Sequence, residues 1–282
     1  MNVKHGEVVK YVGISDGKQL ETAAEMGNVL ELEKEIWRGP YEPMHQMLKN
    51  DAERTLVIGA YLKDELIGFC YGDQTEDDTL SSHLLGIKRE YREMGVGELL
   101  KLKQKEIAGE RGYTKCKWMF EPLEAHTAHL YFTKLRAYGA AYYENREPEM
   151  GAPLDIPADR LLVEWDVVDE DHLRWDAKID ELKEEAIEIA PWSLNVVGLP
   201  VLDIEHQFDR SISYLKDAYT LAIPMNFMKI NIESPSLAED WRYKTRAVFQ
   251  TLFQQGYIVV CLAQTNEHVS HYLFVKRTLF AL

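Results

Sequence analysis

A glycine-bearing turn between a predicted strand and a predicted helix constrains the fold of this chain more than any other feature. Thr79–Ile87 has the composition of a strand, and Glu98–Arg111 carries apolar residues at helical spacing. Between them lies the pattern Arg92-x-x-Gly95-x-Gly97. Glycines let the backbone turn so that successive N–H groups point to one place, where the helix start adds its positive dipole end. The segment therefore predicts an anion site on a strand–turn–helix unit.

The nature of the anion follows from the unpaired amides at a helix start. Each of them needs an acceptor, so backbone groups can bind a diphosphate while Arg92 adds positive charge. A short pattern with three fixed positions also occurs by chance, and an ordinary glycine-bearing turn is the alternative interpretation. The predicted strands and helices around this segment have to decide between an anion site and an ordinary turn.

The first part of the chain predicts strands and helices in alternation. We expect a strand at Glu7–Gly13, a helix or two short helices at Lys18–Trp37, a hairpin of Thr55–Leu62 and Leu66–Tyr71, a strand at Thr114–Phe120, a helix at Leu123–Leu135 and a strand at Leu161–Val168. This order predicts an α/β layered domain over residues 1–168, in place of an all-helical or all-β fold.

The chain changes character after Val168, where an acidic stretch begins. Residues 169–282 are expected to form a smaller α/β unit that repeats the order of elements only faintly. Its predicted elements are strands at Tyr219–Ile223 and Phe227–Ile232, a helix at Leu237–Phe253 and a closing hairpin of Tyr257–Ala263 and His268–Val275.

Charge and hydropathy exclude several classes of partner. The chain has 32 Lys and Arg against 47 Asp and Glu, a net charge of −15, which repels nucleic acid over the whole surface. Its apolar runs are strand-sized, well short of the roughly 20 residues of a membrane-spanning helix. The opening residues lack the apolar core of a secretory signal, so we expect a cytoplasmic protein without a membrane partner.

Neither cysteines nor histidines indicate a metal or a disulfide. Cys70, Cys116 and Cys261 are scattered, which favours buried free thiols. His126 and His129 have the spacing of a metal pair on a helix, but no third ligand accompanies them, so we expect no metal.

Three separated stretches resemble one protein family. Leu84-Leu85-Gly86-Ile87, followed by the segment from Tyr91 to Leu100, is similar to the coenzyme A motif of the GNAT acyltransferase superfamily. Trp118–Leu130 with Lys134-Leu135, and Trp241–Phe249 with Gly256-Tyr257, resemble a branch of predicted acetyltransferases that has a C-terminal extension. The resemblance implies a mixed, splayed central sheet flanked by helices, with a GNAT acyl-CoA-binding domain at 1–168 and an extension at 169–282 that is a degenerate GNAT-like half.

The resemblance also implies the reaction. Acetyl-CoA, or another acyl-CoA, would donate its acyl group to the amine of a small molecule, with amino acids among the candidate acceptors. A catalytically silent protein that binds or senses acyl-CoA is the alternative, and the C-terminal extension could serve a homodimer. The residues that the family motif assigns to the cofactor are Leu85, Gly86, Ile87, Arg92, Glu93, Met94, Gly95, Val96, Gly97 and Glu98.

Three side chains are the catalytic candidates. In the family a backbone N–H at the end of the fourth strand stabilises the oxyanion, and Leu84–Ile87 is the matching stretch. The base that deprotonates the amine would be His83 or Glu121, although His83 could be bonded within the sheet and Glu121 could cap the next helix. The tyrosine that protonates the leaving thiolate in the family aligns with Phe132, and Tyr131, beside it, would point about 100° away.

Two further features have both a functional and a structural interpretation. Trp37–Tyr41 lies where the family shapes its acceptor pocket, and core packing is the alternative. Arg242 and Arg246 share a helix face and would meet the acidic segment after Val168 or, less favoured, an anionic acceptor.

Overall fold

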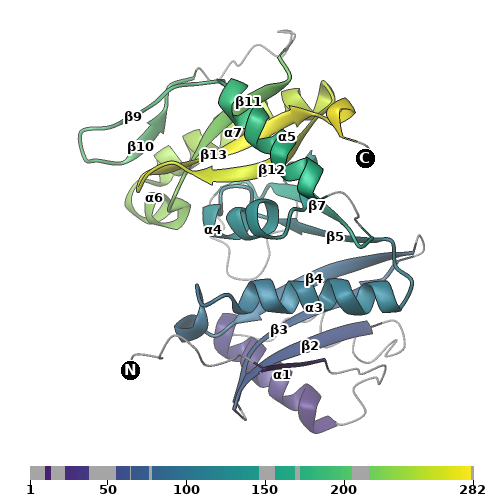
Figure 1. Ribbon diagram of the computed structural model, residues 1–282. Coiled ribbons are helices and arrows are strands. Elements are labelled where there is room, and N and C mark those ends of the chain that lie inside the picture. Colours follow the sequence, from purple (N-terminus) through teal and green to yellow (C-terminus); the bar gives the residue numbers. More distant parts are fainter. Residues whose placement is uncertain are drawn as a thin grey trace. The chain divides into compact units, whose positions relative to one another are not determined.

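The computed structural model is a mixed α/β structure, as the sequence predicts (Figure 1). It describes residues 10–13, 23–37, 55–63, 65–75, 78–145, 156–168, 172–204 and 216–280. The chain divides into two compact units, one of Met1–Trp118 with Asp166–Val168 and the other of Met119–Trp165 with Asp169–Leu282. The family-level boundary expected at Val168 stays a prediction, because a division by compactness does not test it.

The first unit is built on a sheet with the strand order β1-β2-β3-β4-β5. Neighbours are antiparallel from β1 to β4, and β4 and β5 are parallel. Its elements are β1 (Lys10–Gly13), α1 (Ala23–Trp37), β2 (Thr55–Leu62), β3 (Glu65–Gln74), β4 (Thr79–Ile87), a 3₁₀ turn (Arg89–Tyr91), α3 (Val96–Glu110) and the start of β5 (Lys115–Phe120).

Helices α1 and α3 cover opposite faces of this sheet. Successive side chains of a strand point to opposite faces, and β3 shows this. Phe69 and Tyr71 belong to a cluster with Val29 of α1, whereas the thiol of Cys70 contacts the carbonyl oxygen of Leu100 in α3 at 3.6 Å. Because both faces are covered, β3 is an almost continuous apolar run and has no water-facing side.

Strands β4 and β5 pair only at one end. The pairs are Thr79 with Lys115, Leu80 with Cys116 and Ser81 with Lys117, while β4 itself continues to Ile87. Within the described residues no further β4–β5 pair follows Ser81. This partial pairing is the splayed arrangement that the family resemblance implies.

The strands of the second unit follow the order β7-β6-β12-β13-β11-β8, and β9 and β10 form a separate hairpin. Its elements are α4 (Ala125–Ala128), a π-helical segment (His129–Lys134), β6 (Tyr138–Tyr143), β7 (Arg160–Asp166), α5 (His172–Glu185), β8 (Ile187–Glu188), β9 (Trp192–Leu194), β10 (Pro200–Leu202), β11 (Ala218–Pro224), α6 (Phe227–Glu233), α7 (Pro235–Gln254), β12 (Tyr257–Gln264), β13 (Val269–Lys276) and a 3₁₀ turn (Arg277–Leu279).

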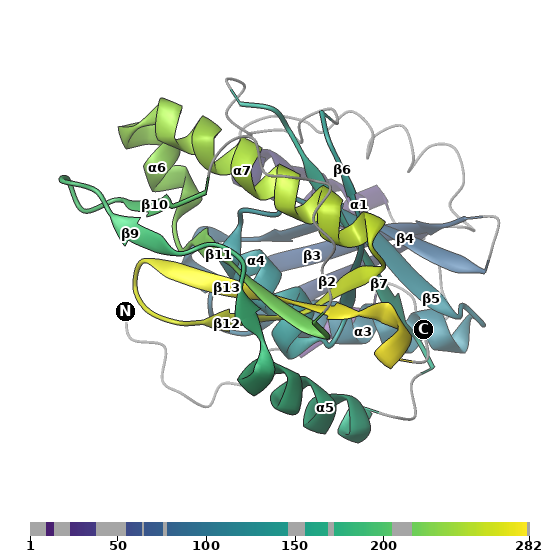
Figure 2. The ribbon, with the colours of Figure 1, turned by 90° about the horizontal axis from the view of Figure 1, so that it is seen from above.

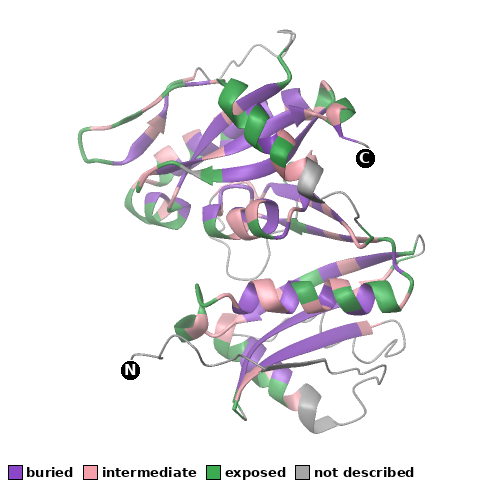
Figure 3. Ribbon diagram, viewed as in Figure 1, coloured by how far each residue is buried: buried purple, intermediate pink, exposed green. Residues whose placement is uncertain are grey.

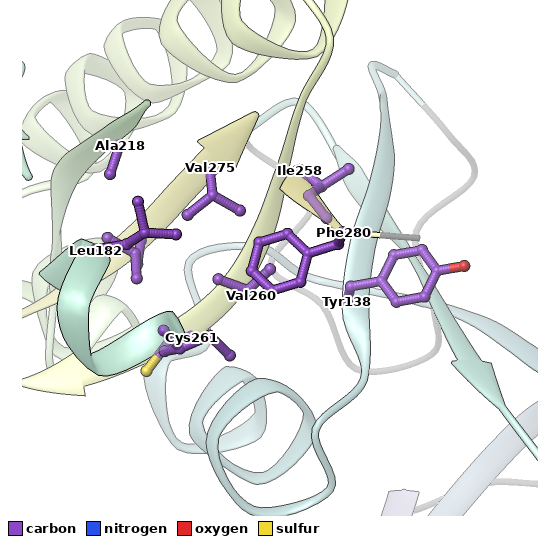
Figure 4. Close-up of a cluster of buried hydrophobic side chains, with 10 residues drawn as sticks. Tyr138, Leu182, Ala218, Ile258, Val260, Cys261, Val275 and Phe280 are labelled. Atoms are coloured by element: carbon purple, nitrogen blue, oxygen red, sulfur yellow. The ribbon is translucent and has the colours of Figure 1, made fainter. Parts of the chain in front are cut away.

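Helices α5 and α7 lie on opposite sides of β11–β13 (Figure 2). On the α5 side, Leu273 and Val275 of β13 pack with Leu182, in the cluster drawn in Figure 4. On the α7 side, Tyr272 and Phe274 contact Phe249 edge to face, with ring centroids 5.3 and 5.1 Å away. Alternate side chains of β13 therefore belong to two hydrophobic cores, one beneath α5 and one beneath α7.

The helices of both units are half-buried, with one face on a sheet and one in water (Figure 3). Among the described residues, no helix combines the length and the apolar composition needed to cross a bilayer.

Two predicted elements have a different conformation. Phe227–Ile232, expected as a strand, is helix α6, because the Asn226 side chain accepts the Lys229 N–H at 2.9 Å and caps its first turn. The helix expected at Leu123–Leu135 is one α-turn followed by a π-helical segment, in which the Leu135 N–H bonds to the Leu130 carbonyl. The predicted residues 7–9 and 18–22 lie outside the described part.

Replacing Phe249 by alanine should destabilise the second unit by about 3–5 kcal/mol, because the ring is fully buried and leaves a cavity between α7 and β13. Phe253→Ala is the matched control, one turn along the same helix and half-buried, with an expected loss of about 1–2 kcal/mol. Urea unfolding measures both variants. Equal losses would contradict the described packing.

Candidate functional site

The segment after β4 forms a tight turn that leads into α3. The Arg92 side chain closes the turn, since its Nε donates to the Ile87 carbonyl oxygen at 3.2 Å. Glu93 and Gly95 both have left-handed backbones, with φ of 64° and 81°. Gly95 is the N-cap residue of α3, and its carbonyl accepts the first bond of the helix from the Leu99 N–H at 3.1 Å.

Left-handed residues alternating with ordinary ones bring successive amides onto one concave side. Val96 and Gly97 are the first residues of α3, so their N–H groups have no carbonyl one turn earlier in the helix. The positive end of the helix dipole lies at the same place. This geometry fits the anion site that the glycine pattern predicts, and the site itself stays a prediction.

An ion pair holds the turn against β3. The Lys88 ammonium lies 2.7 Å from the Glu65 carboxylate, and the Tyr91 hydroxyl donates to the same carboxylate at 3.3 Å. The hydrogen bond from Lys88 is the main cause that lowers the pKa of Glu65. The turn is thus tied to the start of β3 and leaves its own amides for a ligand.

Gly86, in the stretch assigned to the oxyanion donor, lies where no side chain fits. A Cβ atom at this position would come within 2.8 Å of the Trp37 ring and 2.9 Å of Phe69. Trp37 itself contacts Phe69 edge to face, with ring centroids 6.0 Å apart, which is the core interpretation of that residue. Arg38–Tyr41 lie outside the described residues.

His83 is the extra residue of a β-bulge in β4. Opposite it on β3, Tyr71 pairs with Leu84 and Gly72 pairs with Ser82, so His83 has no partner of its own. Bulges are over-represented next to active sites because they redirect one side chain. His83 is half-exposed and its ring lies 5.4 Å from that of Tyr71.

The redirected imidazole meets a carboxylate. His83 Nε2 lies 2.5 Å from Oδ1 of Asp73 on β3, and the two side chains are 31% and 32% exposed. Asp73 was not among the residues singled out from the sequence. The hairpin predicted there stops at Tyr71, and the bulge changes the register by one residue, so the sequence pattern contained no signal for this pair.

Glu121 and Tyr131 belong to the second unit. One Glu121 oxygen accepts the Leu123 N–H at 3.0 Å, which is the capping role considered above, and the other lies 2.5 Å from Arg242 Nη2. Tyr131 is buried in the π-helical segment, where its ring contacts Phe120 edge to face at 5.2 Å. π-Helical turns are frequent at functional sites, and here the turn changes the direction of Tyr131 relative to a regular α-helix. Its role as the acid stays a prediction.

Sequence comparison identifies the domain that contains these residues. Residues 25–136 match the model of the acetyltransferase (GNAT) family. The chain carries a GNAT acetyltransferase domain. No curated protein sequence matches the chain.

Several solved acetyltransferases resemble the GNAT domain and its flanks. The ribosomal-protein-S18-alanine N-acetyltransferase of Escherichia coli is 14% identical, covering 58% of this chain and 98% of its own, with a TM-score of 0.47. A probable acetyltransferase from Staphylococcus epidermidis is 12% identical (57% and 100% covered, TM-score 0.45). A Bacillus subtilis acetyltransferase in complex with CoA is 20% identical (57% and 100% covered, TM-score 0.42). At these scores the structures assign nothing to individual residues.

Within the described residues, Arg242 and Arg246 contact carboxylates other than those of the acidic segment after Val168, and residues 169–171 of that segment lie outside the described part. Arg246 forms two bonds of 2.8 Å to Asp159, and Arg242 bonds to Glu121. Asp159 directly precedes β7, and Glu121 directly follows β5.

The three cysteines confirm the expectation of buried free thiols. All three cysteines are free and buried. His129 lies 3.4 Å from the Leu262 carbonyl oxygen, and His126 is exposed. Within the described residues no three His, Cys, Asp or Glu side chains gather as a metal set.

A buried lysine lies beneath β4 of the GNAT domain. Lys101 of α3 is 1% exposed, and its ammonium donates to Ser82 at 2.8 Å and to Gln104 at 3.0 Å. It also lies 3.7 Å from the centroid of the Trp118 ring. Burial lowers its pKa to about 8. Sequence reasoning missed it, although a lysine at a position that helical spacing places on the apolar face was the available signal.

The low pKa of Lys101 should make stability depend on pH. The folded state loses the proton near pH 8 and the unfolded state near 10.5, so the unfolded state binds more protons between these values and stability rises with pH. We expect the free energy of unfolding of the wild type, minus that of Lys101→Met, to increase by on the order of 3 kcal/mol over this window. Urea unfolding at a series of pH values measures it. A difference that stays flat, or falls, would contradict the buried ammonium.

Proposed function

We propose that this chain transfers an acetyl group from acetyl-CoA to the amine of a small molecule, with amino acids among the candidate acceptors. The observation that carries the proposal is the turn Glu93–Glu98, whose amides converge at the start of α3. This turn follows the end of β4 that no longer pairs with β5. The GNAT family match over residues 25–136 supports the same reaction class.

The residues of the turn fit the diphosphate of coenzyme A. The amides of Val96 and Gly97 supply donors, and Gly95 supplies the left-handed backbone that turns them inward. Arg92 lies at the same end of the strand and adds local positive charge, which an acidic chain needs for an anionic ligand. We assign Leu85–Ile87 to the pantetheine arm and the thioester.

Strand β4 also offers a donor for the oxyanion. Successive amides of a strand point to alternate edges, so about half of those in Leu84–Ile87 point away from β3. That edge has no ladder partner in β5 after Ser81. An amide that is left unpaired in the sheet can bond to the developing negative charge of the thioester carbonyl.

Proton removal is assigned first to His83. Because Asp73 accepts from Nε2, the neutral imidazole keeps Nδ1 as an acceptor, which is the arrangement of an oriented base. Glu121 ranks second as the base because both of its carboxylate oxygens already accept hydrogen bonds, which leaves them less available to take a proton. Once the ammonium has lost its proton, the amine nitrogen attacks the carbonyl carbon, the carbon–sulfur bond breaks and the thiolate leaves. The nitrogen then loses a second proton to give the neutral amide, and this proton replaces the one that the thiolate takes up. Tyr131 is the proposed donor of a proton to that thiolate.

Gly95→Val tests the anion site. A β-branched residue at φ 81° is strained, so the turn should lose its shape and coenzyme A affinity should fall by at least a hundredfold. The matched control is Gly112→Val at the other end of α3, which has the same φ of 81° and equally open surroundings but no converging amides. Calorimetric titration with coenzyme A measures both. If Gly95→Val binds as well as Gly112→Val, the diphosphate is bound elsewhere.

His83→Ala should lower acetyl transfer by about a hundredfold or more, the usual contribution of a positioned base. Asp73→Asn should lower it less, by about tenfold, because the imidazole remains but loses its orienting carboxylate. Thiol release from acetyl-CoA with a library of amines measures turnover, and calorimetry should show unchanged coenzyme A binding. His126→Ala, at an exposed position, is the control.

Two outcomes would redirect the proposal. Full activity of His83→Ala would remove that residue from the mechanism and leave Glu121 as the base. Tight coenzyme A binding by the wild type without turnover on any amine would favour the alternative of a silent acyl-CoA-binding or sensing protein.

A further inference from the structure

The β9–β10 hairpin of the second unit exposes a concentration of apolar side chains. It extends away from the rest of that unit in both views, and its tip is open to water (Figures 1, 2 and 3). Eleven large apolar residues are exposed in the described part of the chain, and four of them fall within residues 187–197, namely Ile187, Leu194, Val196 and Val197. Val196 and Val197 are 104% and 73% exposed, at a turn where polar residues are usual. Such a concentration marks an interaction surface.

One edge of this hairpin, along β10, is covered by α7. The Pro200 carbonyl oxygen accepts a hydrogen bond from Nε1 of Trp241 at 2.9 Å, and the Leu202 carbonyl oxygen accepts one from Nζ of Lys244 at 2.8 Å. Proline also has no N–H to offer at this edge. Both β10 residues are buried. The outer edge of β10 is therefore closed to a further strand.

The other edge, along β9, is open. Directly opposite residues of an antiparallel pair turn their backbone groups either toward each other or both outward. Pro200 and Leu202 turn theirs outward to α7, so Leu194 and Trp192, which lie opposite them, turn theirs outward from β9. Within the described residues, β9 pairs with β10 alone. An edge strand without a charge or a bulge is a template for another strand.

The charge distribution favours a second copy of this chain as the partner strand. Residues 189–202 contain no Asp, Glu, Lys or Arg, although 28% of the whole chain is charged. Two chains that each carry a net charge of −15 repel each other over most of their surfaces, and this uncharged segment is a place where they can approach. A basic partner protein would instead be attracted to the carboxylates elsewhere on the chain. The hairpin thus complements its own copy.

We infer that two copies of this chain associate through β9, antiparallel about a twofold axis at Ser193, and form a four-stranded sheet in the order β10-β9-β9-β10. In this register Trp192 of each copy faces Leu194 of the other, so the outward N–H and C=O groups of both strands are bonded. The tip of each hairpin then lies beside the uncharged segment that precedes β9 in the other copy, where Val196 and Val197 lose contact with water. The inference uses no residue of the acetyltransferase proposal and does not depend on it.

Sedimentation of the full-length protein over a wide range of concentrations measures the association. We expect a reversible monomer–dimer equilibrium with a dissociation constant of roughly micromolar magnitude, because the contact is smaller than a standard interface. Leu194→Pro removes an outward N–H and none that faces β10, so the hairpin should keep its shape while the dissociation constant rises about tenfold or more. Leu194→Val is the matched control, because it keeps that N–H and an apolar side chain, and its dissociation constant should stay within about threefold.

Ser193→Cys tests the position of the twofold axis. Opposite residues of a non-hydrogen-bonded antiparallel pair have Cα atoms about 4.5 Å apart, which a disulfide can span. The three native cysteines are buried. Diamide, which takes two electrons and two protons from a pair of thiols, should therefore convert Ser193→Cys into a covalent dimer. Val197→Cys is the control, because the antiparallel order separates this exposed position from its equivalent in the other copy, and it should stay largely uncrosslinked.

Three results would overturn the inference. These are a wild type that sediments as a monomer at every concentration, a folded Leu194→Pro that dimerises as tightly as the wild type, and equal crosslinking of Ser193→Cys and Val197→Cys. The first would leave β9 to a strand of a different protein. If circular dichroism shows that Leu194→Pro does not fold, the crosslinking contrast decides the question alone. Acetyl-CoA binding and turnover are measured separately, so the failure of this interface and of the acetyltransferase proposal can be told apart.

Discussion

The partial pairing of β4 is the constraint on which the rest of the GNAT domain depends. A central strand satisfies its backbone groups on both edges, and β4 does so with β3 along its length but with β5 only from Thr79 to Ser81. Beyond that point no pair with β5 follows in the described residues. The bulge at His83 and the amide-rich turn before α3 follow within the next few residues. The candidate site residues therefore concentrate at the end of β4, where β5 no longer pairs with it.

The fold keeps that open edge rigid through its other contacts. Gly86 packs against Trp37 and Phe69 with no space for a side chain, and Lys88 ties the following turn to Glu65. Positions with left-handed backbones, Glu93 and Gly95, are held between these contacts and α3. Preorganised donors are effective because they need no rearrangement when charge develops.

Two buried cations show how burial acts differently on lysine and arginine. Burial lowers the pKa of Lys101 to about 8, so the ammonium can lose its proton at moderate cost. Arginine has no such route, because its guanidinium stays charged at any ordinary pH. Arg242 instead keeps its charge beside the carboxylate of Glu121. The same physical penalty thus leads to pH dependence in one unit and to a buried ion pair in the other.

The sequence by itself determined the α/β class, most elements of the first unit and the turn from Arg92 to Glu98. These depend on local chemistry, since hydrophobic periodicity and glycine positions act over a few residues. Only the tertiary structure decided the pairing of His83 with Asp73, the partners of Arg242 and Arg246 and the helical state of Phe227–Ile232. A one-residue bulge, packing between distant segments and a side-chain cap decide these features. None of them is encoded in the spacing of neighbouring residues, because each depends on what the rest of the fold brings alongside.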